Sequence, residues 1–132
     1  MPKVQPIKVL VVDDSAVMRE LLRTIIRSDF FTIVGEAAGG AKAVELADSL
    51  KPDLVCLDIE MPEMSGIETL KALKAKHSRM AVVMVTGSNA AEDVQKSLAG
   101  GADGYILKPF NAGRVLDALT KAVTKVRAAA PK

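Results

Sequence analysis

The sequence predicts an α/β fold: a doubly wound, five-stranded parallel sheet with strand order 2-1-3-4-5 and five flanking helices. Short apolar segments rich in β-branched residues alternate five times with longer segments of helical periodicity, which is typical of βα units. The run Val9–Val12 is apolar throughout, as expected for a strand buried on both faces. Right-handed crossovers restrict the topology, and five-stranded doubly wound sheets commonly take the order 2-1-3-4-5, with a crevice between the first and third strands.

The expected strands are short and contain no proline. Ile7–Val12 is apolar apart from Lys8, and Thr32–Val34 consists only of β-branched residues. Leu54–Leu57 and Ala81–Val85 are wholly apolar, as central strands of a parallel sheet should be. Tyr105–Leu107 adds an aromatic residue to two aliphatic ones.

The expected helices carry apolar residues three and four positions apart, so each presents one apolar stripe. Pro52 ends the second helix just beyond its last apolar residue. Glu92 follows Asn89 by three positions, which indicates a capping arrangement at the start of the fourth. The helices are Ser15–Arg27, Ala41–Leu50, Gly66–Lys76, Asn89–Ala99 and Asn111–Val126.

A chain of 132 residues matches one domain, with tails at residues 1–6 and 127–132 around a domain at 7–126. The composition is 49% hydrophobic, so the chain can form a core. A net charge of +2 argues against a nucleic-acid binder. The single Cys excludes an internal disulfide and favours the cytoplasm. No run approaches the roughly 18 apolar residues of a membrane span, so we expect no membrane insertion.

Polar residues stand where the strands end. Asp13 and Asp14 follow the first strand, Asp58 follows the third, Thr86 ends the fourth and Lys108 follows the fifth. Ligands of doubly wound sheets bind at the carboxyl ends of the strands, at the point where the strand order reverses. We therefore expect these five side chains to meet in one crevice.

Carboxylates gathered in one crevice repel each other, and close like charges raise at least one pKa. A bound cation removes this conflict, and donors that are all oxygens favour Mg²⁺ over zinc. A lysine and a hydroxyl nearby complete the groups for phosphoryl transfer to a carboxylate. Asp58 is the expected nucleophile at the crevice centre, and Asp13 and Asp14 are the expected metal ligands. Singly, such residues are often only turn formers, helix caps or solvated lysines, so the prediction depends on the set.

Four motifs occur in a familiar order and at a familiar spacing, and with them the sequence resembles the receiver domain of bacterial two-component response regulators. The resemblance covers about residues 7–126 and implies a flavodoxin-like fold. Each motif alone is weak, whereas the set is specific. The motifs are Val9–Ser15, Leu57–Pro62 together with Gly66, Val85–Gly87, and Gly101–Phe110.

The resemblance implies a role for each carboxylate. Asp58 matches the phosphoacceptor of the family. Asp14 matches a direct Mg²⁺ ligand, and Asp13 matches an acidic neighbour that acts partly through water. Asp58 and the main-chain carbonyl of Glu60 would complete the protein ligands of Mg²⁺.

The resemblance also implies a switch. Thr86 matches the hydroxyl that moves onto the phosphoryl group, and Lys108 matches the lysine that pairs with it. Tyr105 matches an aromatic residue that turns inward as Thr86 moves. The peptide bond between Lys108 and Pro109 is commonly cis in this family. Phosphorylation adds charge at Asp58, and the rearrangement is expected to bias a remote binding surface.

The implied partners are a sensor histidine kinase, which donates the phosphoryl group, and a downstream protein. The downstream protein would bind the face formed by the helix 89–99, the strand 105–107 and the helix 111–126. A phosphatase is a further candidate partner, and we expect a monomer or weak dimer. Because no output domain follows Val126, we expect a stand-alone regulator in chemotaxis or motility signalling. The stretch Asp14–Arg19 is similar to the receiver of chemotaxis methylesterases.

Other functions stay open at this point. The chain could serve as a phosphate sink, or as a phosphorelay intermediate outside chemotaxis. A small Mg²⁺-dependent phosphatase with an aspartyl-phosphate intermediate would use Glu60 as a second acid, but the chain lacks a cap to exclude water. A flavodoxin-like cofactor module is disfavoured because Asp13 and Asp14 would repel a phosphate. We expect a signalling phosphoacceptor that assists its own phosphorylation and dephosphorylation, not an enzyme.

Two positions depart from the common family pattern. Glu60, two residues past Asp58, could shield or reposition an attacking water, so it bears on the lifetime of the phosphorylated state. Ser65 stands where Asp is frequent before Gly66, and we expect Ser65 to cap the helix that follows.

Overall fold

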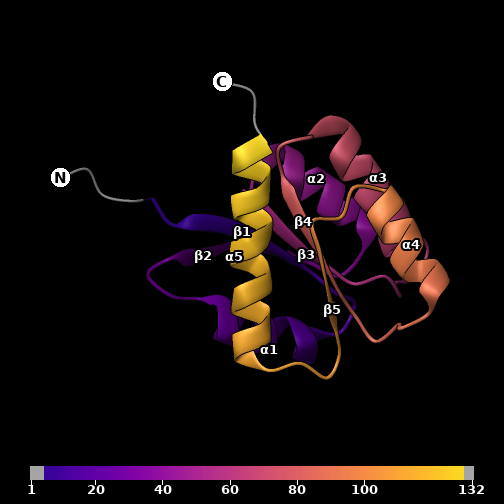
Figure 1. Ribbon diagram of the computed structural model, residues 1–132, viewed down its shortest axis with the longest axis horizontal. Helices are drawn as coiled ribbons and strands as arrows, with labels where there is room; N and C mark the ends of the chain where they lie inside the picture. Colours follow the sequence, from indigo (N-terminus) through magenta and orange to yellow (C-terminus); the bar gives the residue numbers. More distant parts are fainter. Residues whose placement is uncertain (1–4, 130–132) are drawn as a thin grey trace.

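Strands and helices alternate along residues 5–129, the part of the chain that the computed structural model describes (Figure 1). Every predicted strand and helix is confirmed, with boundary shifts of a few residues. The strands are β1 (Ile7–Val12), β2 (Phe31–Ala37), β3 (Leu54–Leu57), β4 (Ala81–Thr86) and β5 (Gly104–Leu107). The helices are α1 (Ala16–Ile26), α2 (Gly40–Leu50), α3 (Gly66–Lys76), α4 (Ala91–Ala99) and α5 (Ala112–Ala129).

The strands form one parallel sheet in the order β2-β1-β3-β4-β5, as predicted. Val12 of β1 lies opposite Leu57 of β3, so the residues that follow them, Asp13 and Asp58, leave the sheet side by side. The main-chain amide of Asp58 donates to the carbonyl of Val12 at 3.0 Å, which extends this register by one residue. The register therefore fixes the two acidic loops relative to each other before any side chain is considered.

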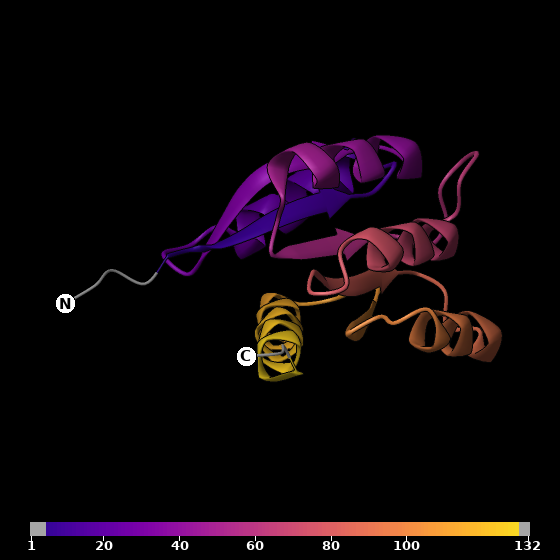
Figure 2. The ribbon, with the colours of Figure 1, turned by 90° about the horizontal axis from the view of Figure 1, so that it is seen from above.

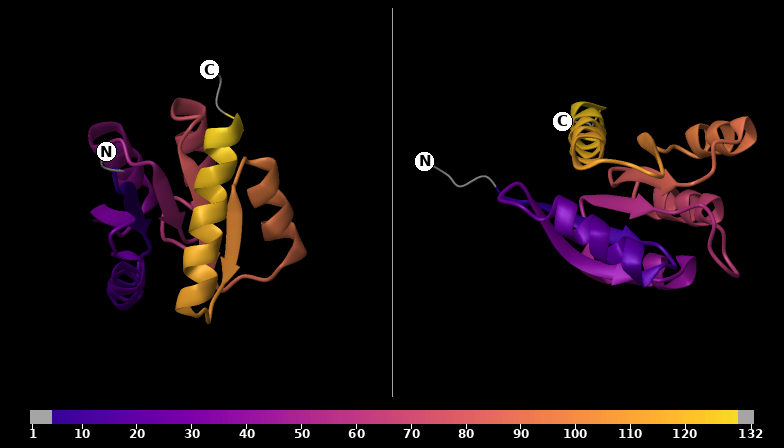
Figure 3. Two further views of the ribbon diagram at one scale, coloured as in Figure 1. Left: turned by 60° about the vertical axis from the view of Figure 1, so that its left-hand side comes forward. Right: turned by 90° about the horizontal axis from the view of Figure 1, so that it is seen from below.

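Helices cover both faces of the sheet (Figures 2 and 3). Side chains alternate across a strand, so Val9 and Val11 of β1 point to one face and Leu10 and Val12 to the other. The first face packs against α1 and α5, and the second packs against α2 and α3. Leu10 is fully buried, and burial of such a side chain stabilises the fold by roughly 1.5–3 kcal/mol.

Cys56 lies inside β3 and is fully buried, as expected for a small apolar core residue. Burial raises the pKa of its thiol to about 12, so the thiol stays protonated at neutral pH. The thiolate is the reactive form of cysteine, so the buried Cys56 is placed for packing in the core.

The largest boundary differences from the predictions lie in β2, α4 and α5. Strand β2 reaches Ala37 because Glu36 and Ala37 pair with β1, whereas the expected strand stopped at Val34. The capping arrangement at Asn89 is wrong: α4 begins at Ala91, and its N-cap residue Ala90 makes no side-chain capping bond.

The last helix, α5, continues to Ala129, three residues beyond the predicted domain end at Val126. Its final turn contains Ala residues, which favour helix without adding to an apolar stripe. The predicted tails fall in part on residues 1–4 and 130–132, which lie outside the described residues. Among the helices of residues 5–129, none combines the length and apolarity needed to cross a bilayer.

The end of α2 offers a test of backbone strain. Lys51 adopts a left-handed conformation, with φ 48° and ψ 59°, at the C-cap position. Glycine accepts this conformation without a steric penalty, so we expect Lys51→Gly to raise the free energy of unfolding by about 0.5–1 kcal/mol. Denaturant unfolding of Lys51→Gly beside Lys51→Ala measures it. Equal stability of the two variants would contradict the strain at this position.

Candidate functional site

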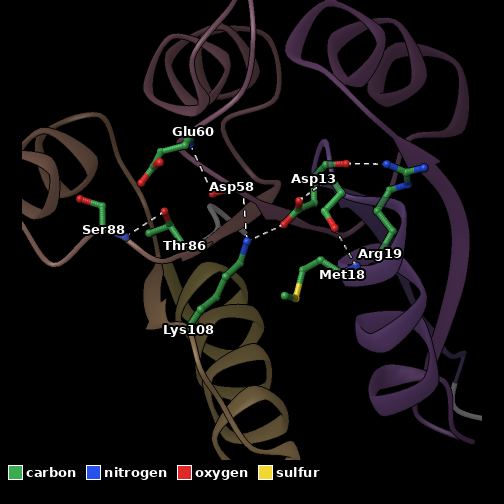
Figure 4. A network of polar contacts seen from close by, with 9 residues as sticks. Asp13, Met18, Arg19, Asp58, Glu60, Thr86, Ser88 and Lys108 are labelled. Atoms are coloured by element: carbon green, nitrogen blue, oxygen red, sulfur yellow. Dashed lines mark hydrogen bonds and ion pairs between the residues drawn. The ribbon is translucent and has the colours of Figure 1, made fainter.

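The strand ends bring the predicted side chains together at one edge of the sheet (Figure 4). Asp13 is 1% exposed, Asp58 is 5% exposed and Thr86 is fully buried, although all three are polar. The Lys108 ammonium points between the carboxylates of Asp13 and Asp58 (Figure 4). The expected convergence is therefore confirmed for Asp13, Asp58 and Thr86, and Lys108 reaches two of them.

The acidic residues form one cluster. Asp13, Asp14 and Asp58 each offer a carboxylate oxygen, and these oxygens all lie within 4.8 Å of one another. Asp13 and Asp58 are buried, whereas Asp14 is exposed and leaves the cluster open on one side. The main-chain amide of Glu60 donates to Asp58 Oδ1 at 3.3 Å, so the Glu60 main chain borders the cluster. Oxygen donors held this close fit a hard divalent cation such as Mg²⁺.

Lys108 neutralises part of the acidic charge. Its Nζ donates to Asp13 Oδ2 at 2.9 Å and to Asp58 Oδ2 at 3.4 Å. Burial lowers the pKa of Lys108, but the hydrogen bond to Asp13 and the charges of both carboxylates outweigh burial, and the pKa is raised. The main-chain amide of Lys108 donates to the carbonyl of Thr86 at 2.9 Å, and the bond to Pro109 is cis, as the resemblance implied. The ammonium group is therefore charged and fixed in place.

The surroundings of Asp58 disfavour the negative charge of its carboxylate. Burial raises its pKa most strongly, and the negative charge of Asp13 adds to the rise, while Lys108 opposes it. The protonated form of Asp58 is thus favoured more in the folded chain than in water. A cation at the acidic cluster would relieve the same unfavourable charge, since it would lie against Asp58 and Asp13 alike.

The loop after β3 requires glycine at one position. The Gly66 amide donates to the carbonyl of Ile59 at 2.8 Å, so the start of α3 lies directly on this loop. A Cβ atom at Gly66 would collide with the main-chain carbonyl of Asp58. Ser65 caps α3 by accepting from the Glu68 amide at 3.2 Å, which confirms the predicted cap. The position of Asp58 therefore depends on a close backbone approach.

Three residues outside the predicted set, Arg19, Arg23 and Glu36, form a network beside the loop after β1, and Arg19 contacts the loop itself. Arg19 of α1 donates from Nη1 to the carbonyl of Asp13 at 2.7 Å (Figure 4). Its Nε donates to Glu36 Oε1 at 3.3 Å, and Arg23 donates to the other oxygen of Glu36 at 2.9 Å. Glu36 lies on the edge strand β2, far in sequence from both arginines, so sequence patterns did not predict these ion pairs. The spacing of the two arginines by one helical turn was the available signal.

Ser88 is a fourth residue outside the predicted set. Its main-chain amide donates to Thr86 Oγ1 at 3.3 Å, and its carbonyl accepts from the Tyr105 hydroxyl at 2.7 Å. Thr86 and Tyr105, the two expected switch residues, are thus joined through Ser88. The contact depends on the loop path after β4, and the motif Val85–Gly87 ends one residue before Ser88.

The family follows from one comparison. The chain matches the response regulator receiver domain over residues 9–120. It belongs to the response regulator receiver domain family.

Individual relatives agree with this receiver assignment. The chain is 42% identical to the chemotaxis protein CheY of Listeria monocytogenes over 88% of this chain and 98% of the relative. The response regulator domain of Thermotoga maritima CheB has a TM-score of 0.82 at 37% identity, covering 96% of this chain and all of that one. A Borrelia burgdorferi structure described as a CheX-CheY-BeF3-Mg complex has a TM-score of 0.83 at 33% identity and covers 87% of each chain. The receiver domain is thus CheY-like, consistent with phosphorelay signalling and chemotaxis.

The charge on Asp58 predicts a stability effect. Because the folded-state pKa of Asp58 is raised, its contribution favours folding below the unfolded value of 3.8 and is lost as pH rises through the folded value. At neutral pH without Mg²⁺, we expect Asp58→Asn to raise the free energy of unfolding by about 1 kcal/mol. Saturating Mg²⁺ should stabilise the wild type more than the variant. Denaturant unfolding at several pH values measures both effects, with the exposed Asp117→Asn as control. A less stable Asp58→Asn without Mg²⁺ would contradict this account.

The surroundings of Tyr105 predict a raised pKa for its hydroxyl group. Burial raises the pKa of its hydroxyl above the usual 10.0, and the negative charges of Asp93, Asp58 and Glu60 act in the same direction. The stabilising contribution of the neutral phenol is present below pH 10 and is lost as pH rises through the raised value. The chain contains one Tyr, so the ultraviolet absorbance of tyrosinate should show one transition, with its midpoint above pH 10. Tyr105→Phe should abolish it, and a midpoint at or below 10 in the folded protein would refute the effect.

Proposed function

We propose that this receiver domain accepts a phosphoryl group on Asp58 from a sensor histidine kinase and then switches the binding of a downstream protein. The observation that carries the proposal is the setting of Asp58, a buried carboxylate within 4.8 Å of two more and within 3.4 Å of the Lys108 ammonium. The chemotaxis proteins among the relatives support a role in chemotaxis or motility. A phosphate sink is the second use of the same chemistry.

The transfer uses groups that the chain itself provides. A carboxylate oxygen of Asp58 attacks phosphorus and forms an O–P bond, while the P–N bond of the phosphohistidine breaks and its electron pair returns to the imidazole nitrogen. Lys108 Nζ lies close enough to follow the charge that builds on the phosphoryl oxygens. A small acyl phosphate would serve as donor in the same way, with its carboxylate as leaving group. We therefore propose a phosphoacceptor that assists its own reaction and processes no separate substrate.

The acidic cluster would hold Mg²⁺ through Asp13, Asp14 and Asp58, together with the main-chain carbonyl of Glu60. Bound there, Mg²⁺ supplies positive charge against the phosphoryl oxygens. Arg19 fixes the carbonyl of Asp13 and so keeps the first acidic loop in position. Glu60 is exposed, and its carboxylate is free to influence the water that hydrolyses the acyl phosphate.

The partner surface in this proposal is the α4–β5–α5 face. Strand β5 lies between the two helices (Figures 1 and 3). Leu98 of α4 is 59% exposed, and Leu107 of β5 is 45% exposed. In this proposal the two exposed leucines would be covered by the downstream protein. Tyr105 belongs to β5 and bonds to Ser88 in the loop before α4, so this face is tied to the phosphorylation site.

The first experiment is intact-mass measurement after incubation with acetyl phosphate and Mg²⁺. We expect a labile gain of one phosphoryl group that requires both Mg²⁺ and Asp58. The Asp58→Asn variant should gain nothing, since its amide is a poor nucleophile, and Asp117→Asn should behave as wild type. The decay of the adduct then reports the effect of Glu60. A wild-type protein that gains no mass, or a gain that persists in Asp58→Asn, would refute the proposal.

A further inference from the structure

A groove lined by basic side chains runs along the amino-terminal edge of the sheet. It consists of four neighbouring hollows, with volumes from about 290 to about 450 Å³. The hollows share lining residues, since Arg79 lines three of them and Asp53 also lines three. Asp53 precedes β3, whereas Asp58 follows it, so this basic groove lies at the edge opposite the acidic cluster.

Positive charge is concentrated in the basic groove. Its lining includes seven of the 18 Lys and Arg residues of the chain but only two of the 16 Asp and Glu residues. Besides Arg79, the basic residues are Lys8, Lys51, Lys74, Lys76, Lys125 and Arg127. The groove therefore has five more positive than negative groups, whereas the whole chain has a net charge of only +2.

The two carboxylates of the groove are bonded to the sheet. Asp53 Oδ2 accepts from the Lys8 amide at 2.9 Å, and Asp103 Oδ2 accepts from the Val82 amide at 2.9 Å. Asp103 also pairs with Lys74 at 2.7 Å. Both acidic residues therefore join strand ends to one another, and together they leave most of the cations in the groove without a counter-charge.

Arg79 lies at the centre of the groove and is exposed. Within residues 5–129 it forms no ion pair. Cations near the carboxyl ends of helices offset the helix dipole, which accounts for Lys76 in α3 and Arg127 in α5. Arg79 belongs to the loop between α3 and β4, so this explanation does not extend to it. Its guanidinium is suited to bind a carboxylate through two parallel hydrogen bonds.

The backbone of Lys51 gives a second indication. Lys51 is left-handed, with φ 48°, at a position where glycine would fit without strain. Its side chain lines the same hollow as Arg79. Strained residues persist most often at functional positions. A lysine here lowers the stability of the fold and adds a cation to the groove.

We propose that the basic groove binds an acidic segment of a partner protein. The carboxylates of Asp53 and Asp103 lie among the cations, which favours spaced negative charges over the uniform charge of a nucleic-acid backbone. No Phe, Tyr or Trp lines the four hollows, so the groove offers nucleotide bases no aromatic side chain on which to stack. Binding at this edge leaves the acidic cluster open and does not rest on phosphoryl transfer to Asp58.

Fluorescence anisotropy of a fluorescein-labelled peptide of alternating Glu and Ser tests the proposal on the unmodified protein. We expect saturable binding at about 0.15 M salt, where charges are screened beyond about 8 Å. Arg79→Gln and Lys51→Gln should each weaken binding about fivefold, as loss of one exposed ion pair would. In amide NMR spectra, the peptide should shift resonances of the groove, such as those of Asp53 and Arg79, and leave the resonance of Asp13 in place.

Lys121→Gln is the matched control. Lys121 is exposed on α5 and pairs with Asp117 at 3.0 Å, and it does not line the groove. Its replacement removes the same charge, but peptide affinity should stay within about twofold of wild type because of screening. Denaturant unfolding should give equal stability for wild type and Arg79→Gln, which separates lost binding from lost folding.

Three outcomes would overturn the proposal. Equal weakening by Lys121→Gln and Arg79→Gln would reduce the effect to net charge. Failure of the wild type to show saturable peptide binding would remove the groove as a docking site for acidic segments. Tighter binding of single-stranded oligothymidylate than of the peptide would assign the groove to nucleic acid instead.

Discussion

Repulsion among buried carboxylates is the constraint on which the rest of the structure depends. Asp13 and Asp58 are withdrawn from water and face each other at the sheet edge, with Asp14 beside them. Among the described residues, only Lys108 forms an ion pair with these carboxylates. Its Nζ lies 2.9 Å from Asp13 Oδ2 and 3.4 Å from Asp58 Oδ2. This energetically unfavourable arrangement fits the proposed roles of Asp58, since a bound cation or phosphoryl group would use the same concentration of charge. The acidic cluster therefore lowers the free energy of unfolding at the position where phosphoryl transfer is proposed.

The backbone maintains this arrangement. The pairing of β1 with β3 sets the two acidic loops side by side, and the bond from the Lys108 amide to Thr86 extends the pairing of β4 with β5. Arg19 pins the first loop through a carbonyl, and Gly66 lets α3 approach the second. Each contact uses a main-chain atom, so the side chains of the site stay available for ligands. A rigid frame of this kind is what precise positioning of reactive groups requires.

Signal transmission needs the opposite property, a region that can move. The loop after β4 and the start of α4 are held by a few side-chain contacts centred on Ser88, in contrast to the dense packing of the sheet. A rearrangement at the acidic cluster would therefore displace this loop more readily than the sheet. The loop lies next to the exposed leucines of α4 and β5. The same domain thus sets main-chain-supported acidic loops beside a region held by fewer contacts, which suits the proposed switch.

The sequence by itself determined the fold class, the strand order and the convergence of Asp13, Asp58, Thr86 and Lys108. The apolar pattern of a strand followed by a helix recurs five times along the chain. The ends of parallel strands meet at one edge of the sheet, so strand-end residues can be placed without coordinates. Only the tertiary structure decided which neighbours hold them. The contacts of Arg19, the start of α4 at Ala91 and the bonds of Ser88 depend on loop paths and on pairs of residues distant in sequence. Single contacts of this kind leave no periodic signal, because each is formed once and between particular atoms.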